Sequence, residues 1–348
     1  MHGRQADTIS LFMTGLLLGL ALLFVIPASA RAAEALPADI VATDHQKYSY
    51  DEMREDMQQL CAKYPGLLSS CTIGQSVQGR EIVQMTLGNP AAPHRIMIQA
   101  AMHAREYMTS QLVMEIVEYI CNNYGQQNVN GVPYSTLFTD TCFVILPMVN
   151  PDGVMISQQG VAAAVKPHTI EWLNSVVNAG GNLTQLKANS NGVDLNQNFA
   201  QGFGGSTHTR PGPWLDYFCG FSPASEPETQ ALMNCARSQN FSLHINYHTS
   251  GNIIYYSDVL ANPNTHARSK ILMDTIRGYT GYKGIRKDQA AAGGGCFADF
   301  VTSEFQRPTV TVEIGTKNPV PIGQFATIFK KNRDTWGAVA FMLYAGAL

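Results

Sequence analysis

Residues 95–123 read RIMIQAAMHAREYMTSQLVMEIVEYICNN, and this stretch decides the fold. Residues 95–100 are rich in Ile and Met, which is typical of a buried strand. Residues 107–123 place apolar side chains at helical spacing. A strand that opens into a helix in this way is typical of an α/β protein, in which the sheet fixes the backbone and the loop at the strand end exposes side chains.

Apolar segments on both sides of this stretch continue the alternation. Because strands alternate with helices, we expect an α/β sandwich in which helices cover both faces of one sheet. The expected strands are 81–87, 142–149, 241–247 and 309–314. The expected helices are 226–238, 322–343 and a first helix that Ser49 or Asp51 could cap and that runs to Lys63.

Turn residues and polar residues give four more local expectations. The strands 81–87 and 95–100 are joined by a short segment with Gly and Pro, which predicts a hairpin. Residues 150–153 (NPDG) predict a tight turn. Ser225 is the expected cap of the helix that follows it. Residues 154–220 lack periodicity, which indicates a long functional loop region.

Composition favours one large folded domain. The 348 residues are 45% apolar and only 14% charged, unlike a disordered chain. The formal net charge is −3 and the basic residues are scattered. Nothing resembles the basic footprint of a nucleic-acid-binding protein, so we expect no nucleic acid partner.

The first residues are typical of a targeting segment. Arg4 precedes a weakly polar run at residues 11–26, and small residues follow it. We therefore predict a signal peptide at 1–32, a short segment at 33–46 and the main domain at 47–348. An uncleaved N-terminal anchor is the alternative, although the run is short for a membrane span. With the leader removed, we expect no stable span and a location in the periplasm or outside the cell.

Seven cysteines fit an oxidising compartment, because exported thiols tend to pair. No CxxC motif occurs, which disfavours a thiol-ligated structural zinc. Pairing between sequence neighbours is our starting hypothesis. It joins Cys61 to Cys71, Cys121 to Cys142 and Cys219 to Cys235, and leaves Cys296 unpaired.

His103 and Glu106 follow directly after the strand 95–100. A histidine and a carboxylate three residues apart at a strand end can converge on one metal ion. An HxxE pair alone is weak evidence, since short motifs recur by chance and a surface charge pair would look the same.

A second histidine strengthens the metal hypothesis. His244, Asn246 and His248 alternate along the strand 241–247 and its end, so they share one face. His248 stands where the strand breaks, and a His, Glu, His set leaves zinc an open position for water. His244 lies deeper in the strand, and we expect it to be a hydrogen-bonded core histidine instead.

Glu313 ends the apolar strand 309–314. A carboxylate buried there requires a partner, so a cation or a proton-transfer role would explain it. A salt-bridged core carboxylate is the alternative.

Together these residues resemble the zinc carboxypeptidases related to carboxypeptidase A, from about residue 47 to the C-terminus. Seven motifs in a fixed order carry the resemblance. They are GQSVQGR at 74–80, HARE at 103–106, PMVNPDG at 147–153, GVDLN at 192–196, SEPE at 225–228, HTSG at 248–251 and TVEIG at 311–315.

The resemblance implies a mixed, mostly eight-stranded sheet, amide hydrolysis, and one Zn²⁺ per chain bound by His103, Glu106 and His248. Asp194 matches the acidic residue that bonds the first ligand histidine. Asn196 matches a contact to the substrate carboxylate. Glu313 matches the base that takes a proton from the attacking water and returns it to the leaving amine.

Two positions depart from the family's exopeptidases. Gln197 stands where they carry an arginine that clamps the C-terminal carboxylate of the substrate through two hydrogen bonds. The usual oxyanion arginine is not obvious either, and Lys187 is its best substitute. Ordinary carboxypeptidase A or B behaviour is therefore in doubt.

Other features are more similar to the bacterial γ-D-glutamyl-diaminopimelate peptidases of the same fold. They are the run KAN at 187–189 and the segment EIGTKNPVP at 313–321. Asp299 lies near the stretch that in this family lines the pocket for the residue after the scissile bond. It could pair with a side-chain amine or serve only as a helix-start carboxylate.

The leading hypothesis is an exported zinc peptidase that cuts peptidoglycan stem peptides, or muropeptides, before a diamino acid. One alternative is a general metallocarboxypeptidase in which another cation replaces the missing arginine. Another is an inactive peptide-binding protein, which the complete set of metal ligands and base disfavours.

Overall fold

The computed structural model describes residues 39–257, 260–287 and 294–348. The expected signal peptide, residues 1–32, lies outside these ranges, as does the first part of segment 33–46. No helix within the described ranges is long and apolar enough to cross a membrane.

An eight-stranded mixed sheet forms the centre of the fold, in the order β1-β2-β6-β3-β7-β10-β8-β9. Strands β6, β3, β7 and β10 are parallel. At one edge β1 and β2 run antiparallel to their neighbours, and near the other edge β8 runs antiparallel to β10 and parallel to β9. This confirms the expected fold class. The strands are β1 (Leu68–Gln75), β2 (Glu81–Leu87), β3 (His94–Gln99), β6 (Thr141–Leu146), β7 (Leu243–Thr249), β8 (Ile253–Tyr256), β9 (Lys283–Arg286) and β10 (Thr309–Ile314).

The expected hairpin between residues 81–87 and 95–100 is wrong. β6 lies between β2 and β3, antiparallel to the first and parallel to the second. All six residues of β6 are buried, as expected for a central strand covered on both faces. A strand from far along the sequence therefore separates two strands that a short segment connects.

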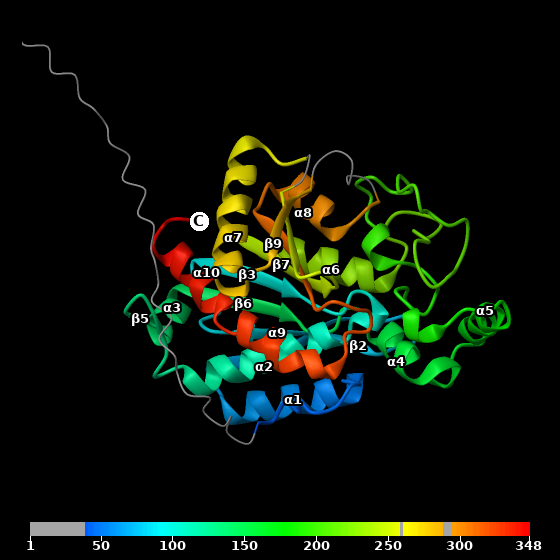
Figure 1. Cartoon of the computed structure of the whole chain (residues 1–348), viewed down its shortest axis with the longest axis horizontal. Helices are drawn as coiled ribbons and strands as arrows, with labels where there is room; N and C mark the ends of the chain where they lie inside the picture. The colour runs from blue at the N-terminus through cyan, green and yellow to red at the C-terminus, as the bar shows by residue number, and fades with distance from the viewer. Residues whose placement is uncertain (1–38, 258–259, 288–293) are drawn as a thin grey trace, which may run out of the picture. The chain divides into compact units, whose positions relative to one another are not determined.

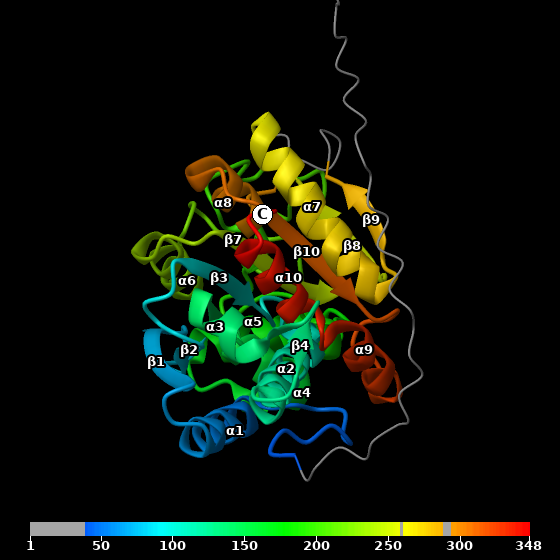
Figure 2. The same cartoon turned by 90° about the vertical axis from the view of Figure 1, so that its left-hand side faces the viewer.

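Helices cover both faces of the sheet. Figure 1 shows α1 and α2 below the strands and α8 above them, and Figure 2 shows β10, β8 and β9 beside α7. One large apolar cluster packs a sheet face mainly against six helices. They are α1 (Tyr50–Lys63), α2 (Met108–Asn123), α3 (Tyr134–Asp140), α7 (Pro263–Thr280), α9 (Phe325–Asn332) and α10 (Thr335–Tyr344).

The opposite face packs against α6 (Pro227–Ser238) and α8 (Phe297–Phe305) in a second apolar cluster. A third cluster surrounds α4 (Pro151–Gln159) and α5 (Pro167–Asn178). A separate two-stranded sheet consists of β4 (Asn128–Val129) and β5 (Val132–Pro133).

Several local expectations need correction. The NPDG segment opens helix α4, because Asn150 Oδ1 accepts a hydrogen bond from Gly153 N and caps the first turn. Helices α4 and α5 therefore occupy part of the expected loop 154–220. Glu226, and not Ser225, is the residue before α6, and it makes no side-chain cap. The single closing helix is two helices, α9 and α10.

The neighbour pairing of cysteines is also wrong where the sheet separates the partners. Cys121 belongs to the apolar cluster under α1 and α2, whereas Cys142 belongs to the cluster under α6 and α8. The two thiols lie on opposite faces of the sheet, so they cannot form a bond. All seven cysteines are free thiols in this structure.

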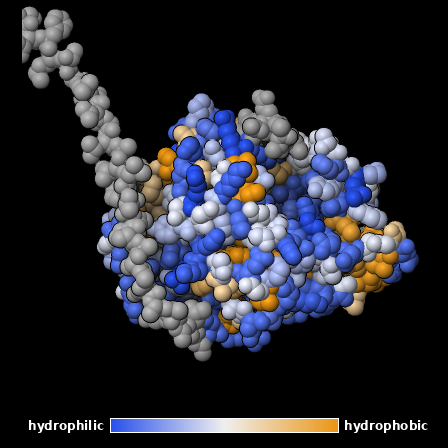
Figure 3. Space-filling view, viewed as in Figure 1, coloured by the Kyte–Doolittle hydropathy of each residue, from blue (hydrophilic) through white to orange (hydrophobic). Residues whose placement is uncertain are grey.

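The surface carries few large apolar side chains. On the face shown in Figure 3, hydrophilic residues dominate and apolar residues form small patches. Phe221 and Val165 are the most exposed large apolar residues of the described chain, at 84% and 70%. Scattered apolar residues of this kind are normal for a folded protein.

Candidate metal centre

The loop after β3 carries His103 and Glu106 into the interior. Residues Ala104–Glu106 form one turn of 3₁₀ helix before α2 begins at Met108. The Thr109 hydroxyl donates to Glu106 O and accepts from Ala101 N, which ties the loop to the first turn of α2. His103 and Glu106 are both buried, so the loop holds a charged pair in a fixed position.

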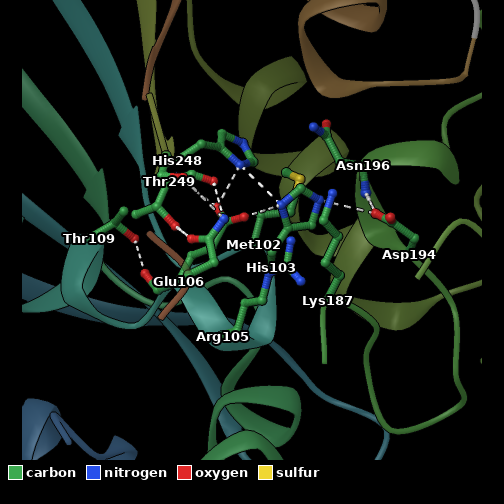
Figure 4. A network of polar contacts seen from close by, with 12 residues as sticks. Met102, His103, Arg105, Glu106, Thr109, Lys187, Asp194, Asn196, His248 and Thr249 are labelled. Carbon is green, nitrogen blue, oxygen red and sulfur yellow. Dashed lines mark hydrogen bonds and ion pairs between the residues drawn. The ribbon is translucent and has the colours of Figure 1, made fainter. Parts of the chain in front are cut away.

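His248 reaches the same point from the end of β7, the neighbour of β3 in the sheet. Its Nδ1 lies 3.0 Å from Glu106 Oε2 and 3.3 Å from His103 Nδ1. His103 Nδ1 lies 2.8 Å from Glu106 Oε1. Figure 4 shows the three side chains pointing toward one another. The structure thus brings together the three residues expected to bind the metal.

This donor set fits a zinc ion. One ligand atom from each of His103, Glu106 and His248 lies within 4.8 Å of the others. The two imidazole nitrogens lie 3.3 Å apart beside one carboxylate, so a single cation could bind all three groups. Two nitrogens and one carboxylate are a common ligand set of catalytic zinc sites.

The electrostatics of the three groups are coupled. Burial opposes charge on His103, but the carboxylates of Glu106 and Asp194 outweigh it and raise the histidine pKa to about 9. Glu106 has a pKa held well below its usual range, because His103 and His248 overcome the effect of its burial. Burial and the charge of His103 lower the pKa of His248. The Glu106 carboxylate therefore stays ionised, as a ligand of a cation must be.

Asp194 orients the first histidine. Its Oδ1 lies 3.1 Å from His103 Nε2, and its Oδ2 accepts a hydrogen bond from Tyr217 N. Asp194 Oδ1 also accepts from Asn196 N, in a turn of 3₁₀ helix that starts there. With Nε2 bonded to a carboxylate, His103 presents Nδ1 to the centre, as expected for a residue that bonds a ligand histidine.

Glu313 stands on β10, opposite His248 in the parallel register, so both side chains share one face. Burial raises the pKa of Glu313 to about 8, and the negative charge of Glu106 adds to this effect. The backbone of Glu313 pairs with β7 and β8, whereas its side chain makes no hydrogen bond to another described residue. A carboxylate beside the metal ligands that holds a proton near neutral pH is suited to proton transfer.

Lys187 also reaches the centre. Its backbone oxygen accepts from Ala104 N, which places it against the His103 loop. Burial opposes its charge, but Asp194 and Glu106 raise its pKa, so it stays a cation. Its Nζ lies 5.0 Å above the ring of Tyr217. Figure 4 shows Lys187 beside His103.

The expected substrate contacts lie at the start of α8. Asn196 Oδ1 accepts a hydrogen bond from Phe297 N and thereby anchors that helix. Gly295 adopts φ +70, and a Cβ there would lie 2.3 Å from Phe199 O, so only glycine allows the loop to pass this close. Gln197 stands beside that loop, and its Oε1 is buried without a hydrogen-bond partner in the described structure.

The negative charge of Asp299 is balanced by a neighbouring lysine. Lys287 Nζ donates to Asp299 Oδ1 and to Cys296 Sγ, and both charged side chains are largely buried. Any amine that reaches Asp299 would therefore share it with Lys287.

Sequence reasoning missed Lys287 and Tyr217, and it misjudged His244. Lys287 pairs with Asp299 through tertiary packing, and Tyr217 lies in a stretch without periodicity, so neither gave a signal. His244 was expected to be a hydrogen-bonded core residue. It is buried, but neither of its ring nitrogens has a partner within the described ranges.

Comparison with known proteins points to one family. A family model described as zinc carboxypeptidase matches residues 53–335. Gamma-D-glutamyl-L-diamino acid endopeptidase 1 of Lysinibacillus sphaericus is 32% identical over 293 residues, which cover 82% of this chain and 70% of that protein. The carboxypeptidase N catalytic chain of Homo sapiens is 28% identical over 225 residues, which cover 60% and 43%.

Solved structures agree in fold. Thrombin activatable fibrinolysis inhibitor superposes with a TM-score of 0.70 at 16% identity, over 86% of this chain and 75% of that one. Carboxypeptidase A from Helicoverpa armigera gives a TM-score of 0.64 at 19% identity, over 88% and 75%.

Proposed function

This chain belongs to the zinc carboxypeptidase family and is a metallopeptidase that uses one zinc ion, and on this premise we propose that it hydrolyses peptide bonds before a diamino acid in peptidoglycan stem peptides. The convergence of His103, Glu106 and His248, with Glu313 beside them, is the observation that carries the hydrolytic role. The name of the Lysinibacillus sphaericus relative supports the substrate class.

His103, Glu106 and His248 would hold the zinc ion. When bound, zinc supplies a Lewis acid that polarises the carbonyl of the scissile bond. Asp194 keeps His103 Nε2 bonded, so that Nδ1 is directed to the metal. Buried side chains around the site limit exchange of the ligands with bulk water.

Glu313 would act as the general base, accepting a proton from the attacking water and delivering it to the leaving amine. Its raised pKa makes both directions of transfer accessible near neutral pH. Lys187 would stabilise negative charge on the carbonyl oxygen, because its ammonium is buried beside the ligands and has no competing salt bridge within the described ranges.

Substrate preference would follow from two positions. Gln197 carries no charge, so the site lacks the bidentate clamp for an α-carboxylate that an arginine provides. The Lys287–Asp299 pair is electrically balanced. Such a pair matches the free end of meso-diaminopimelate, which carries both an ammonium and a carboxylate, better than the single ammonium of lysine.

The purified zinc-loaded protein can be tested on two sets of substrates. One set is muropeptides with γ-D-glutamyl-meso-diaminopimelate or γ-D-glutamyl-lysine bonds, and the other is ordinary peptides that end in Phe or Leu. Mass spectrometry of the products identifies the bond cut, and Glu313→Gln is the inactive control. We expect cleavage before the diamino acid. A wild-type preference for plain C-terminal Phe or Leu would replace this proposal with a general carboxypeptidase.

The ligand assignment has a test of its own. Metal analysis should find one zinc ion per wild-type chain and about none in His103→Ala. Equal zinc content in both proteins would refute the assignment, whatever the substrate.

We also propose that the protein is exported and that two pairs of thiols become disulfides. The signal peptide predicted at 1–32 and the number of cysteines support export. Cys71 is the cross-strand partner of Gln84, and the Gln84 side chain accepts a hydrogen bond from Cys235 Sγ, so both thiols lie beside one residue. The other pair is Cys61 with Cys121, on the packed helices α1 and α2.

A further inference from the structure

His244 is a buried histidine that the catalytic site does not use. It lies on the same face of β7 as His248, four residues earlier, so it is about 13 Å from the metal ligands at 3.3 Å per residue. Its ring packs near Phe241 and Phe297 and is 1% exposed. Neither ring nitrogen has a hydrogen-bond partner within the described structure. Buried polar groups nearly always have one, so this side chain requires an explanation.

His244 also lines a pocket. It has a volume of about 260 Å³ and lies where α6, α8 and the start of β7 meet. Phe241 and Phe305 form its apolar walls, and Arg307 and Glu304 bring charge to it. Ligand pockets commonly measure roughly 300 to 1,000 Å³. This pocket therefore suits a molecule of about the size of one amino acid.

The charges around the pocket favour an anion. Glu304 is neutralised by a two-point ion pair with Arg237. Arg307 donates one N–H to Asn240 and makes no ion pair with any described residue. Arg268 lies near Arg307. Burial and the charge of Arg307 both lower the pKa of Arg268. One guanidinium at the pocket thus remains available for a carboxylate.

His244 supplies neutral hydrogen-bonding groups. Burial and the charge of Arg307 lower its pKa to about 3, so the imidazole is uncharged at neutral pH. A neutral imidazole has one N–H donor and one acceptor nitrogen. Both are unused here, and both belong to a side chain that lines the pocket.

We propose that this pocket is a second binding site, separate from the metal centre, for a small monocarboxylate with an apolar body. The carboxylate pairs with Arg307, the apolar body lies between Phe241 and Phe305, and a polar group of the ligand reaches His244. Free amino acids and arylalkanoic acids belong to this class. Neither the metal ligands nor Glu313 take part.

Isothermal titration of the zinc-loaded protein with 3-phenylpropanoate, with 3-phenylpropanamide as the uncharged analogue, tests the proposal. We expect saturable binding of the acid, at least 10-fold weaker binding of the amide, and a shift of the His244 ring signal in the NMR spectrum. Arg307→Gln should weaken binding of the acid at least 10-fold while peptidase activity stays within twofold of wild type. Arg105→Gln, an arginine beside the metal centre, is the matched control.

The proposal fails if acid and amide bind equally, if Arg307→Gln has no effect, or if Arg105→Gln weakens binding as much. It also fails if a high-resolution crystal structure with the acid shows only ordered water at His244. Thermal unfolding of each variant confirms that it is folded, and Arg307→Lys, which keeps the charge, should retain more binding than Arg307→Gln. The titration, the NMR shift and the crystal structure do not depend on turnover, so the test of binding is independent of the proposed substrate.

Discussion

Replacing Asp194 with Asn should weaken zinc binding without disrupting the fold. The amide keeps the shape of the side chain and an oxygen that can accept from Tyr217 N. It removes the negative charge that lies 3.1 Å from His103 Nε2. His103 then loses the partner that fixes its ring orientation and makes it a stronger ligand.

The size of the effect follows from burial. The side chains of His103 and Asp194 are 8% and 2% exposed, so water cannot easily replace the lost carboxylate. Loss of such an outer partner typically costs about 10- to 100-fold in metal affinity. We expect the upper part of this range, which corresponds to about 2 to 2.7 kcal/mol of binding free energy.

Competition with a chromophoric chelator at fixed pH measures the zinc dissociation constant of each protein. Asp152→Asn is the matched control, because Asp152 is also buried and paired, with Arg80, but does not contact a metal ligand. It should lower thermal stability and leave zinc affinity within about threefold of wild type. An Asp194→Asn affinity equal to wild type, or a matching loss in Asp152→Asn, would refute the orienting role.

Four further experiments have defined outcomes. Glu313→Gln should keep one zinc ion and lose about 10² to 10⁴ in kcat, together with the acid limb of the pH profile, since the base must be deprotonated; more than a tenth of wild-type kcat would exclude this role. Gln197→Arg should speed hydrolysis of peptides ending in Phe or Leu about 10-fold, if one charged hydrogen-bonded contact worth about 1.5 to 3 kcal/mol forms; an unchanged kcat/KM would place the clamp elsewhere. Burial and nearby acids raise the pKa of Glu115 in the folded protein to about 9. The stability that Glu115 contributes is therefore full below its unfolded pKa and is lost as the pH rises toward 9. Glu115→Gln should raise Tm more at pH 8.5 than at pH 5, and an equal change in Tm at both pH values would contradict the raised pKa. Non-reducing peptide mapping of the protein isolated from its producing cells should find Cys71 linked to Cys235, and seven free thiols would refute the proposed export into an oxidising space.

Contiguous signals made part of the fold predictable. The strand 309–314 was placed to the residue, because its apolar run is bounded by Pro308 and Gly315. The HARE motif was read correctly as a strand end that opens into a helix. The convergence with His248 could be expected because a histidine at a second strand end shares an edge of the sheet.

Pairing between distant segments was not predictable from one sequence. The false hairpin arose because a short connection favours neighbours, whereas burial places β6 between β2 and β3. The same limit hid the partner of Asp299, since nothing in the sequence shows that Lys287 reaches it. His244 illustrates the reverse case: its burial was predictable, but its lack of partners depends on three separate segments around it.

The strand order also determines when the enzyme can become active during its own synthesis. β3, β7 and β10 are neighbours in the sheet, yet their ends stand at residues 99, 249 and 314 of the chain. A nascent chain has no complete metal site until β7 has been made, and no base until β10 has docked between β7 and β8. Contacts of such long sequence separation form late in folding. Hydrolytic activity therefore requires that the chain has been synthesised at least as far as the end of β10, at residue 314.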